Sequence, residues 1–159
     1  MAKTVRNWSE FQKAVEGRIQ LALRQTRDVV AKCLQESLNE YYKEKVFRGG
    51  ISNQPVVNDR TYALLNSMVK TDVVKNGNRF HCEVKIDENY LQYNYEDNGN
   101  TGLEVLTMNE QLGWHGVTPE YHVQGEHRIW TEAVNNIMEE GGVLSIFKEK
   151  LRRCGINVR

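Results

Sequence analysis

The chain has 159 residues, a length that suits a single domain over residues 1–159. Apolar residues make up 40% and charged residues 26% of the chain, which is typical of a globular protein with a buried core. The 21 basic and 21 acidic side chains cancel, so no overall electric field attracts nucleic acid or an anionic membrane. No apolar run reaches the roughly 20 residues that span a bilayer, and the N-terminal stretch lacks the apolar core of a signal peptide. We therefore expect the protein to fold in a cytoplasm.

A helical pattern over residues 8–46 predicts the longest element of the chain. Asn7 or Ser9 is expected to cap this helix, because each is followed three residues later by Glu or Gln, the spacing of a capping box. Unbroken, the helix is roughly 50 Å long, which exceeds a compact core of this size. Two arrangements fit the pattern: an unbroken helix whose apolar stripe is partly covered by another chain, or a helix broken near Gly17 or Thr26 that packs on its own domain. The stripe begins with Phe11, Val15, Ile19 and Ala22.

Residues 60–87 predict a helical turn followed by a β-hairpin, which forms the centre of the expected sheet. Asn76-Gly77 indicates the hairpin turn, because a type I′ turn needs positive φ at both central positions. After the turn, apolar and polar residues alternate with a period of two, which predicts a half-buried strand with one wet face. The apolar members of this strand are Phe80, Cys82, Val84 and Ile86.

Residues 88–124 have the least regular pattern, with many Asn and Gly residues and scattered apolar ones. We interpret this segment as an irregular surface arm, because long loops inside compact domains usually have a function of their own. Apolar side chains exposed on such an arm make sense where a partner covers them. The predicted interface residues are Tyr90, Tyr93, Tyr95, Leu103, Leu106 and Trp114.

Residues 125–159 predict two helices separated by Gly141-Gly142, then a short terminal strand after Gly155. In the second helix, Leu144 and Phe147 are expected to point inward. The whole chain is thus predicted to be α+β, with a long N-terminal helix, a small antiparallel sheet built on the central hairpin, two C-terminal helices and the terminal strand. The predicted core residues are Leu64, Leu65, Val73, Phe80, Val84, Trp130, Phe147 and Leu151.

The sequence carries no recognisable catalytic motif, and we predict no enzyme, no catalytic residue, no cofactor and no metal. Cys33, Cys82 and Cys154 are far apart and form no CxxC pair, so we expect ordinary thiols. His115, His122 and His127 lack the tight spacing of metal ligands. A small metal-dependent nuclease that uses these histidines is one alternative, and a regulatory module that binds a helical partner is another.

The order of these elements resembles the neck or tail-completion proteins of long-tailed bacteriophages, a family of head–tail joining and minor tail components. The resemblance is carried by residues Asp59–Ser67, by the WHG stretch at Trp114, and by Phe147–Val158 with its helix–Gly–strand ending. Many members of the family have DTG where this chain has NDRT.

The resemblance implies a structural virion protein that forms a six- or twelve-fold ring between the head connector and the tail. A subunit of a tail terminator ring is the alternative. The implied partners are copies of this chain and other neck, connector and tail proteins, with DNA passing through the ring lumen without sequence-specific binding and no membrane. The protein is then expected in the host cytoplasm before assembly and in the virion neck or tail afterwards. A net charge near zero suits subunits that pack closely.

Overall fold

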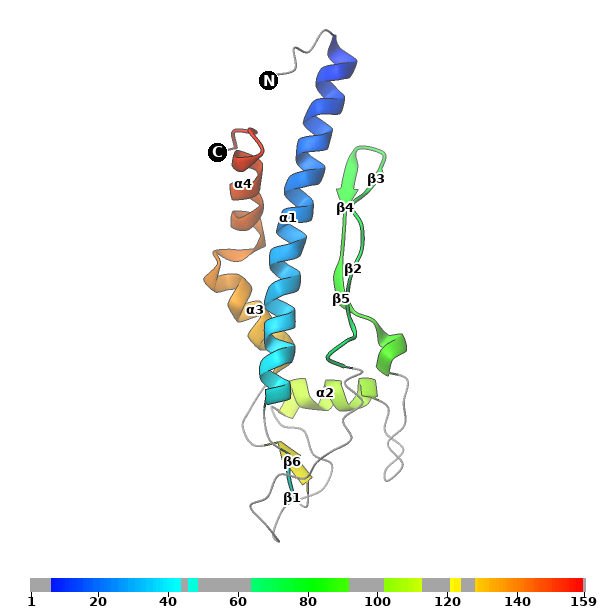
Figure 1. Ribbon diagram of the computed structural model, residues 1–159, viewed down its shortest axis with the longest axis vertical. Coiled ribbons are helices and arrows are strands. Elements are labelled where there is room, and N and C mark those ends of the chain that lie inside the picture. The colour runs from blue at the N-terminus through cyan, green and yellow to red at the C-terminus, as the bar shows by residue number, and fades with distance from the viewer. Residues whose placement is uncertain are drawn as a thin grey trace. The chain divides into compact units, whose positions relative to one another are not determined.

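The computed structural model describes residues 7–43, 46–48, 64–91, 102–112, 121–123 and 128–158 (Figure 1). The fold is α+β, as predicted, with a long N-terminal helix, antiparallel pairs of short strands and two C-terminal helices. Among the helices in these ranges, none is long and apolar enough to cross a membrane. The elements are α1 (Trp8–Lys43), β1 (Val46–Arg48), β2 (Met68–Lys70), β3 (Val74–Asn76), β4 (Arg79–His81), β5 (Val84–Ile86), the 3₁₀ helix η1 (Glu88–Leu91), α2 (Gly102–Leu112), β6 (Tyr121–Val123), α3 (Ile129–Glu139) and α4 (Gly142–Arg153).

The chain divides into two compact units, which are described separately below. Unit 1 consists of Met1–Val30, Lys70–Val84 and Ile137–Arg159. Unit 2 consists of Ala31–Val69 and Lys85–Asn136.

The start of α1 is fixed by Asn7, one of the two predicted caps. Its Oδ1 accepts a hydrogen bond from the backbone N–H of Glu10 at 2.9 Å. Its carbonyl oxygen accepts the first helical hydrogen bond, from the N–H of Phe11 at 3.1 Å. The Asn7 side chain therefore satisfies one of the N–H groups that a helix leaves without partners at its N-terminus.

The helix α1 is unbroken, so the alternative with a break near Gly17 or Thr26 is wrong. Thr26 lies inside the helix, where its Oγ1 donates to the carbonyl of Ala22 at 2.9 Å. The predicted end at residue 46 is also wrong. The helix ends at Lys43, and Val46 begins the strand β1.

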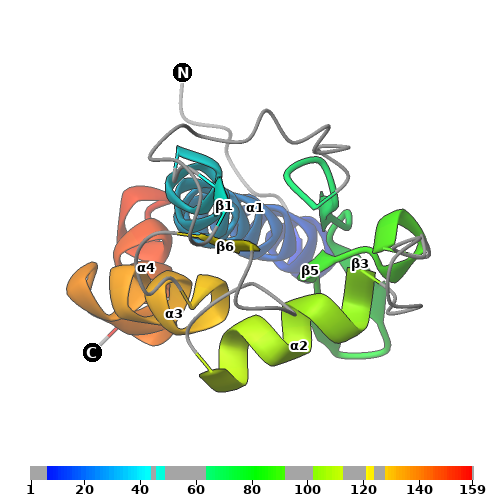
Figure 2. The ribbon, with the colours of Figure 1, turned by 90° about the horizontal axis from the view of Figure 1, so that it is seen from below.

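Within unit 1, α4 lies along one side of α1 and the β3–β4 hairpin lies along another, as the two perpendicular views show (Figures 1 and 2). In the antiparallel hairpin, Asn76 pairs with Arg79. The two-residue loop is therefore Gly77-Asn78, one residue later than the predicted Asn76-Gly77 turn. Gly77 has a φ of 59°, a conformation that glycine adopts without steric cost.

The predicted alternation along the second half of the hairpin is confirmed. On the inner face Phe80, Cys82 and Val84 are half-buried and Ile86 is buried, whereas on the other face His81, Glu83 and Lys85 are exposed. The hairpin is longer than β3 and β4 alone, because β2 pairs with β5.

Two glycine sites shape the C-terminal part of unit 1. Gly141 and Gly142, with φ of 93° and 80°, separate α3 from α4 as predicted. At the end of α4, Gly155 adopts a φ of 78° and its N–H donates to the carbonyl of Arg152 at 2.9 Å. The N–H of Ile156 donates to the carbonyl of Leu151 at 2.9 Å, which completes a Schellman motif.

The predicted terminal strand at Ile156–Val158 is wrong, because these residues form neither helix nor strand. Arginine side chains bond two backbone carbonyl oxygens in and beside this segment. Arg152 Nη2 donates to the carbonyl of Val158 at 3.2 Å, and Arg18 Nη1 donates to the carbonyl of Gly155 at 3.4 Å.

The buried core of unit 2 lies against the second part of α1. Among the residues of this unit whose burial is described, the buried ones are Ala31, Cys33, Leu34, Ser37, Leu38, Tyr41, Leu64, Ser67, Ile86, Leu91, Leu106, Ile129 and Ala133. In the same unit β1 pairs antiparallel with β6, with Val46 opposite Val123. This pairing joins two segments that are distant in sequence, and the sequence pattern did not indicate it.

The interpretation of residues 88–124 as an irregular arm is wrong over part of its length. The segment contains η1, the eleven-residue helix α2 and the strand β6. The helix α2 contacts η1, so it is packed into unit 2.

Two of the predicted inward-facing residues are exposed. Leu64 and Leu151 are buried as predicted, and five other predicted core residues are half-buried. Trp130 is 37% exposed and Leu144 is 66% exposed, so the prediction that both lie inside is wrong. The half-buried residues are Leu65, Val73, Phe80, Val84 and Phe147.

Candidate functional site

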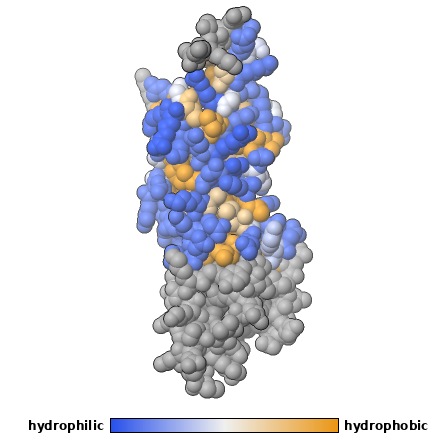
Figure 3. All heavy atoms as spheres, viewed as in Figure 1, coloured by the Kyte–Doolittle hydropathy of each residue, from blue (hydrophilic) through white to orange (hydrophobic). Residues whose placement is uncertain are grey.

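Exposed apolar side chains are the feature of the described residues that points to function. Figure 3 shows apolar residues gathered in separate patches among a hydrophilic surface. Contiguous exposed apolar patches often mark the sites where a protein binds a partner. The patches in the two units are taken in turn below.

The predicted interface residues that the structure describes lie in unit 2, and they differ from one another in exposure. Tyr90 in η1 is 48% exposed and Leu103 in α2 is 39% exposed. These two elements contact each other. Leu106 is only 5% exposed, so the prediction that its side chain is exposed is wrong. The remaining predicted residues, Tyr93, Tyr95 and Trp114, lie outside the described residues.

The position of α2 depends on Glu110, which links it to α3 within unit 2. Glu110 Oε1 accepts a hydrogen bond from the N–H of Trp130 at 2.6 Å, and Oε2 accepts one from the N–H of Thr131 at 3.4 Å. A carboxylate at a helix N-terminus both satisfies free N–H groups and interacts favourably with the helix dipole. Glu110 thus caps α3 from a neighbouring helix.

The most exposed aromatic residues of unit 1 lie at the start of α1. We call Asn7–Ala14 the helix tip, because every residue in it is exposed. Trp8 is 75% exposed and Phe11 is 46% exposed, and their ring centroids are 5.5 Å apart. The two rings therefore form one apolar feature on the helix tip.

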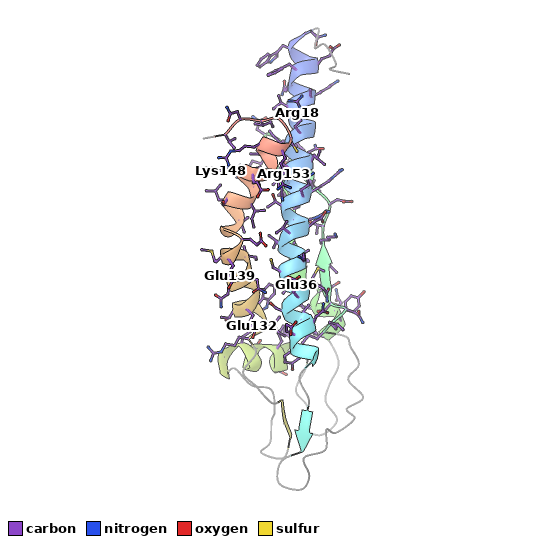
Figure 4. The ribbon with its side chains drawn as sticks, turned by 60° about the vertical axis from the view of Figure 1, so that its left-hand side comes forward. Arg18, Glu36, Glu132, Glu139, Lys148 and Arg153 are labelled. Atoms are coloured by element: carbon purple, nitrogen blue, oxygen red, sulfur yellow. The ribbon has the colours of Figure 1, made fainter. Side chains whose placement is uncertain are left out.

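The helix tip continues an apolar face that is buried further along α1. Trp8, Phe11 and Val15 are three and four residues apart, and the same spacing leads on to Ala22, which is fully buried. In Figure 4 the helix runs on past Arg18, which contacts the C-terminal end of α4. From Arg18 back to Trp8 the helix extends for about 15 Å. The apolar face of α1 thus outruns the elements of unit 1 that cover it.

A second apolar patch of unit 1 lies where α3 turns into α4. We call Met138, Val143 and Leu144, with the adjoining Glu139 and Glu140, the α3–α4 corner. The three apolar side chains are 63%, 51% and 66% exposed, respectively. The sulfur of Met138 lies beside the turn, because a Cβ placed on Gly142 would be 3.6 Å from Met138 Sδ.

Charge is distributed unevenly over the C-terminal helices of unit 1. Glu139 and Glu140 lie at the corner, and no basic residue occurs between residues 137 and 147. At its other end α4 carries Lys150, Arg152 and Arg153 in its last turn. Figure 4 shows Arg153 toward the same end as Arg18, and Glu139 toward the other end of α4.

The hairpin of unit 1 is fixed to α1 by a half-buried arginine. The side chain of Arg27 is 10% exposed, and its Nη1 donates to the carbonyl oxygen of Thr71 at 2.7 Å. The N–H of Glu83 on the opposite strand donates to the hydroxyl of Thr71 at 2.8 Å. The N–H of Thr71 still donates to the carbonyl of Glu83 at 3.0 Å.

Two exposed ion pairs support the same attachment. Lys70 Nζ lies 2.8 Å from Asp28 Oδ1, and Lys75 Nζ lies 2.7 Å from Glu16 Oε1. The hydrogen bond from Lys70, with a smaller contribution from Arg27, lowers the pKa of Asp28 below its ordinary value. The hydrogen bond from Lys75 likewise lowers the pKa of Glu16.

The described residues offer few groups for catalytic or metal chemistry. Among them, no cluster of three His, Cys, Asp or Glu side chains is arranged to hold a metal ion. Burial raises the pKa of the Cys82 thiol, which keeps this thiol protonated at neutral pH. His115 and His127 lie outside the described residues, and His122 belongs to β6.

The fold and these surfaces define an α+β protein that exposes apolar residues at a helix end and at a helix–helix corner. The chain belongs to the YomN family. The model of this family, described as YomN, matches residues 7–153. The match begins at the residue that caps α1 and ends at the last residue of α4. No curated protein and no solved structure matches the chain.

Proposed function

We propose that this chain is a structural virion protein, a neck or tail-completion subunit that forms a ring and joins the head connector of a bacteriophage to the tail. The subunit acts by non-covalent docking and carries out no chemical reaction. Its partners are copies of itself and the neighbouring neck, connector and tail proteins. DNA passes through the lumen of the ring without sequence-specific binding, and the protein resides in the virion.

The helix tip is the observation that carries this proposal. This helix end is capped by Asn7, yet Trp8 is 75% exposed and Phe11 is 46% exposed, so it is ordered with much of its apolar surface in water. Exposure of Trp8 and Phe11 to water is unfavourable in free energy, because an aromatic side chain of this size removes on the order of 150–250 Å² of surface from water when it is covered. A subunit that completes its packing only in an assembly has this property.

Two separate apolar patches also suit a ring better than a simple dimer. A ring is built from heterologous contacts, in which one patch of a subunit meets a different patch of the next. The helix tip and the α3–α4 corner are two such patches in unit 1.

A subunit of a tail terminator ring is a second form of the same proposal. One experiment tests both forms and distinguishes them. The gene is silenced in cells that produce the phage, and the particles are counted by negative-stain electron microscopy. Loss of a joining subunit gives DNA-filled heads and detached tails of normal length. Loss of a terminator gives tails whose length is no longer uniform. Tailed particles in wild-type number and form would contradict both.

A metal-dependent nuclease remains a prediction that no observation in the described residues favours. Its test is cleavage of DNA or RNA by the purified chain in the presence of Mg²⁺, Mn²⁺ or Zn²⁺. The proposed structural role predicts no cleavage with any of these ions. Cleavage that is lost in His115→Ala would contradict that role.

A further inference from the structure

We infer that one end of unit 1, called the basic end below, binds the phosphate backbone of double-stranded DNA. The side chains of the basic end are Arg18 on α1 and Lys148, Arg152 and Arg153 on α4. All four belong to unit 1. The inference deepens the proposed function by naming the surface of the subunit that contacts DNA, and it rests on that function for the place of the surface in the ring lumen.

The basic end brings together side chains from two helices that are distant in sequence. Arg18 Nη1 donates to the carbonyl oxygen of Gly155 at 3.4 Å, and Arg152 Nη2 donates to the carbonyl oxygen of Val158 at 3.2 Å. Two guanidinium groups are therefore bound to one four-residue segment, residues 155–158. A guanidinium has five N–H donors, so each group keeps further donors for a phosphate.

The carboxylates of this region leave most of its positive charge without a partner. Residues 147–158 contain four basic side chains and one acidic side chain, that of Glu149. This carboxylate pairs with Arg153, and its Oε1 lies 3.7 Å from Lys150 Nζ. The basic side chains for which the described residues provide no carboxylate partner are Arg18, Lys148 and Arg152.

Two of these charges are placed unfavourably for the fold itself. Lys148 and Arg152 are four residues apart in α4, so they lie on one face of the helix, where like charges repel and destabilise it. The helix dipole favours Arg152 in the last turn, but its effect falls off before Lys148 is reached. A repulsion of this kind is relieved when an anion binds to the surface.

The exposure and the chemistry of the basic end fit a polyanion. Figure 4 shows Arg18, Lys148 and Arg153 toward the same end of the two helices. The three arginines are exposed and Lys148 is half-buried. The planar guanidinium group donates to two phosphate oxygens at once.

Double-stranded DNA supplies the anions that such a surface needs. It carries one negative charge per about 1.7 Å of helix axis, so several exposed cations can be neutralised together by one duplex. Contacts to phosphates hold no sequence information. They therefore suit a subunit that contacts DNA of any sequence as the DNA moves past.

The inference is tested by fluorescence anisotropy of a short labelled duplex, titrated with the full chain at several salt concentrations. Lys148→Gln/Arg152→Gln should weaken binding at least about 10-fold at low salt and reduce the slope of log affinity against log salt by about two, one for each lost phosphate contact. Arg24→Gln/Arg79→Gln is the matched control. It removes the same charge from exposed positions of unit 1 outside the basic end, and should change the dissociation constant by less than about 2-fold.

A variant that gains affinity guards against a folding defect. Glu149→Gln removes the carboxylate that pairs with Arg153 and should tighten binding about 3-fold, a gain that misfolding cannot produce. No saturable binding of the duplex at low salt, an equal loss of affinity in the matched control, or weaker binding by Glu149→Gln would overturn the inference.

Two competitors identify the partner. An unlabelled duplex of another sequence should displace the labelled duplex as well as the same sequence does, because the contacts reach only phosphates. Phosphatidylserine vesicles should bind more weakly than DNA, and tighter binding to the vesicles would overturn the inference by assigning the surface to a membrane. None of these results alters the particle count after gene silencing, so failure of the DNA-binding surface and failure of the proposed function are distinguishable.

Discussion

The two halves of α1 follow the same sequence pattern but have different surroundings. From Ala31 to Tyr41 the apolar side chains are largely buried in unit 2, and Leu38 is fully buried. From Trp8 to Val30 most side chains are exposed or half-buried, and Trp8 is 75% exposed. The helix itself is continuous, so the difference lies in what covers each half. In the first half Ala22 is buried, but the apolar stripe continues to the exposed residues Phe11 and Trp8, as expected of a surface that a partner covers.

The largest expected effect compares two apolar residues of this one helix. Leu38→Ala removes a fully buried side chain, so it should lower the free energy of unfolding by about 3 kcal/mol through lost burial and the cavity that remains. Phe11→Ala removes a larger side chain but should cost less than about 0.5 kcal/mol, because exposed substitutions rarely matter more. Urea unfolding followed by circular dichroism, at a concentration where the chain is monomeric, measures both. Equal costs would mean that the helix tip is packed within the chain.

The next effect concerns the arginine that fixes the hairpin to the first half of α1. Arg27→Met should cost about 2 kcal/mol, because it removes a charge-assisted hydrogen bond to the carbonyl of Thr71 from a side chain that is 10% exposed. Arg24→Met is the matched control, since Arg24 is exposed on the same helix and should change stability by less than about 0.5 kcal/mol. Similar effects of both substitutions would argue against a specific role of Arg27.

In unit 2 a smaller effect should follow from removing the cap of α3. Glu110→Ala leaves the N–H groups of Trp130 and Thr131 without their carboxylate, and we expect a loss of about 1 kcal/mol. Gln111→Ala, at the exposed neighbouring position, serves as the control. Hydrogen exchange should also become faster in the first turn of α3. An unchanged exchange rate there would show that Glu110 contributes nothing to the helix start.

The smallest effect depends on pH and comes from the ion pairs that Asp28 makes with Lys70 and Arg27. The pKa of Asp28 is lowered in the folded chain, so its contribution to stability is fully present above the unfolded pKa near 3.8 and is lost as pH falls through the lower folded pKa. Asp28→Asn should therefore cost about 0.5 kcal/mol at neutral pH, as exposed pairs do, and nothing at pH well below the folded pKa. Urea unfolding at both pH values measures this, and a difference that persists in acid would assign the effect to another cause.

Local signals in the sequence were sufficient to predict the elements that depend on few residues. The helix start at Asn7, the Gly141-Gly142 break and the alternation through Phe80 and Val84 each follow from chemistry within a few positions. The hairpin loop was misplaced by one residue, because both Asn76-Gly77 and Gly77-Asn78 contain turn-forming residues and the register of the strands decides between them.

What the sequence did not reveal depends on contacts between distant segments. The helix α2 lies among Asn and Gly residues, and the structure shows that burial of Leu106 and the capping contact of Glu110 place it in unit 2. Likewise, an apolar stripe identifies the face of a helix but not what covers that face. For this reason Trp130 and Leu144 were expected inside. The sequence also allowed a partner to cover part of the stripe of α1, but it did not indicate which part is exposed.

The most direct test of the account is native mass spectrometry of the purified full chain across a concentration series. A ring subunit should give monomers at low concentration and one closed species of six or twelve copies at high concentration, with few intermediates, because closure adds a junction without adding a copy. An open ladder of sizes without a preferred species, or a monomer at every concentration, would contradict the claim that this chain assembles into a ring through its own exposed surfaces.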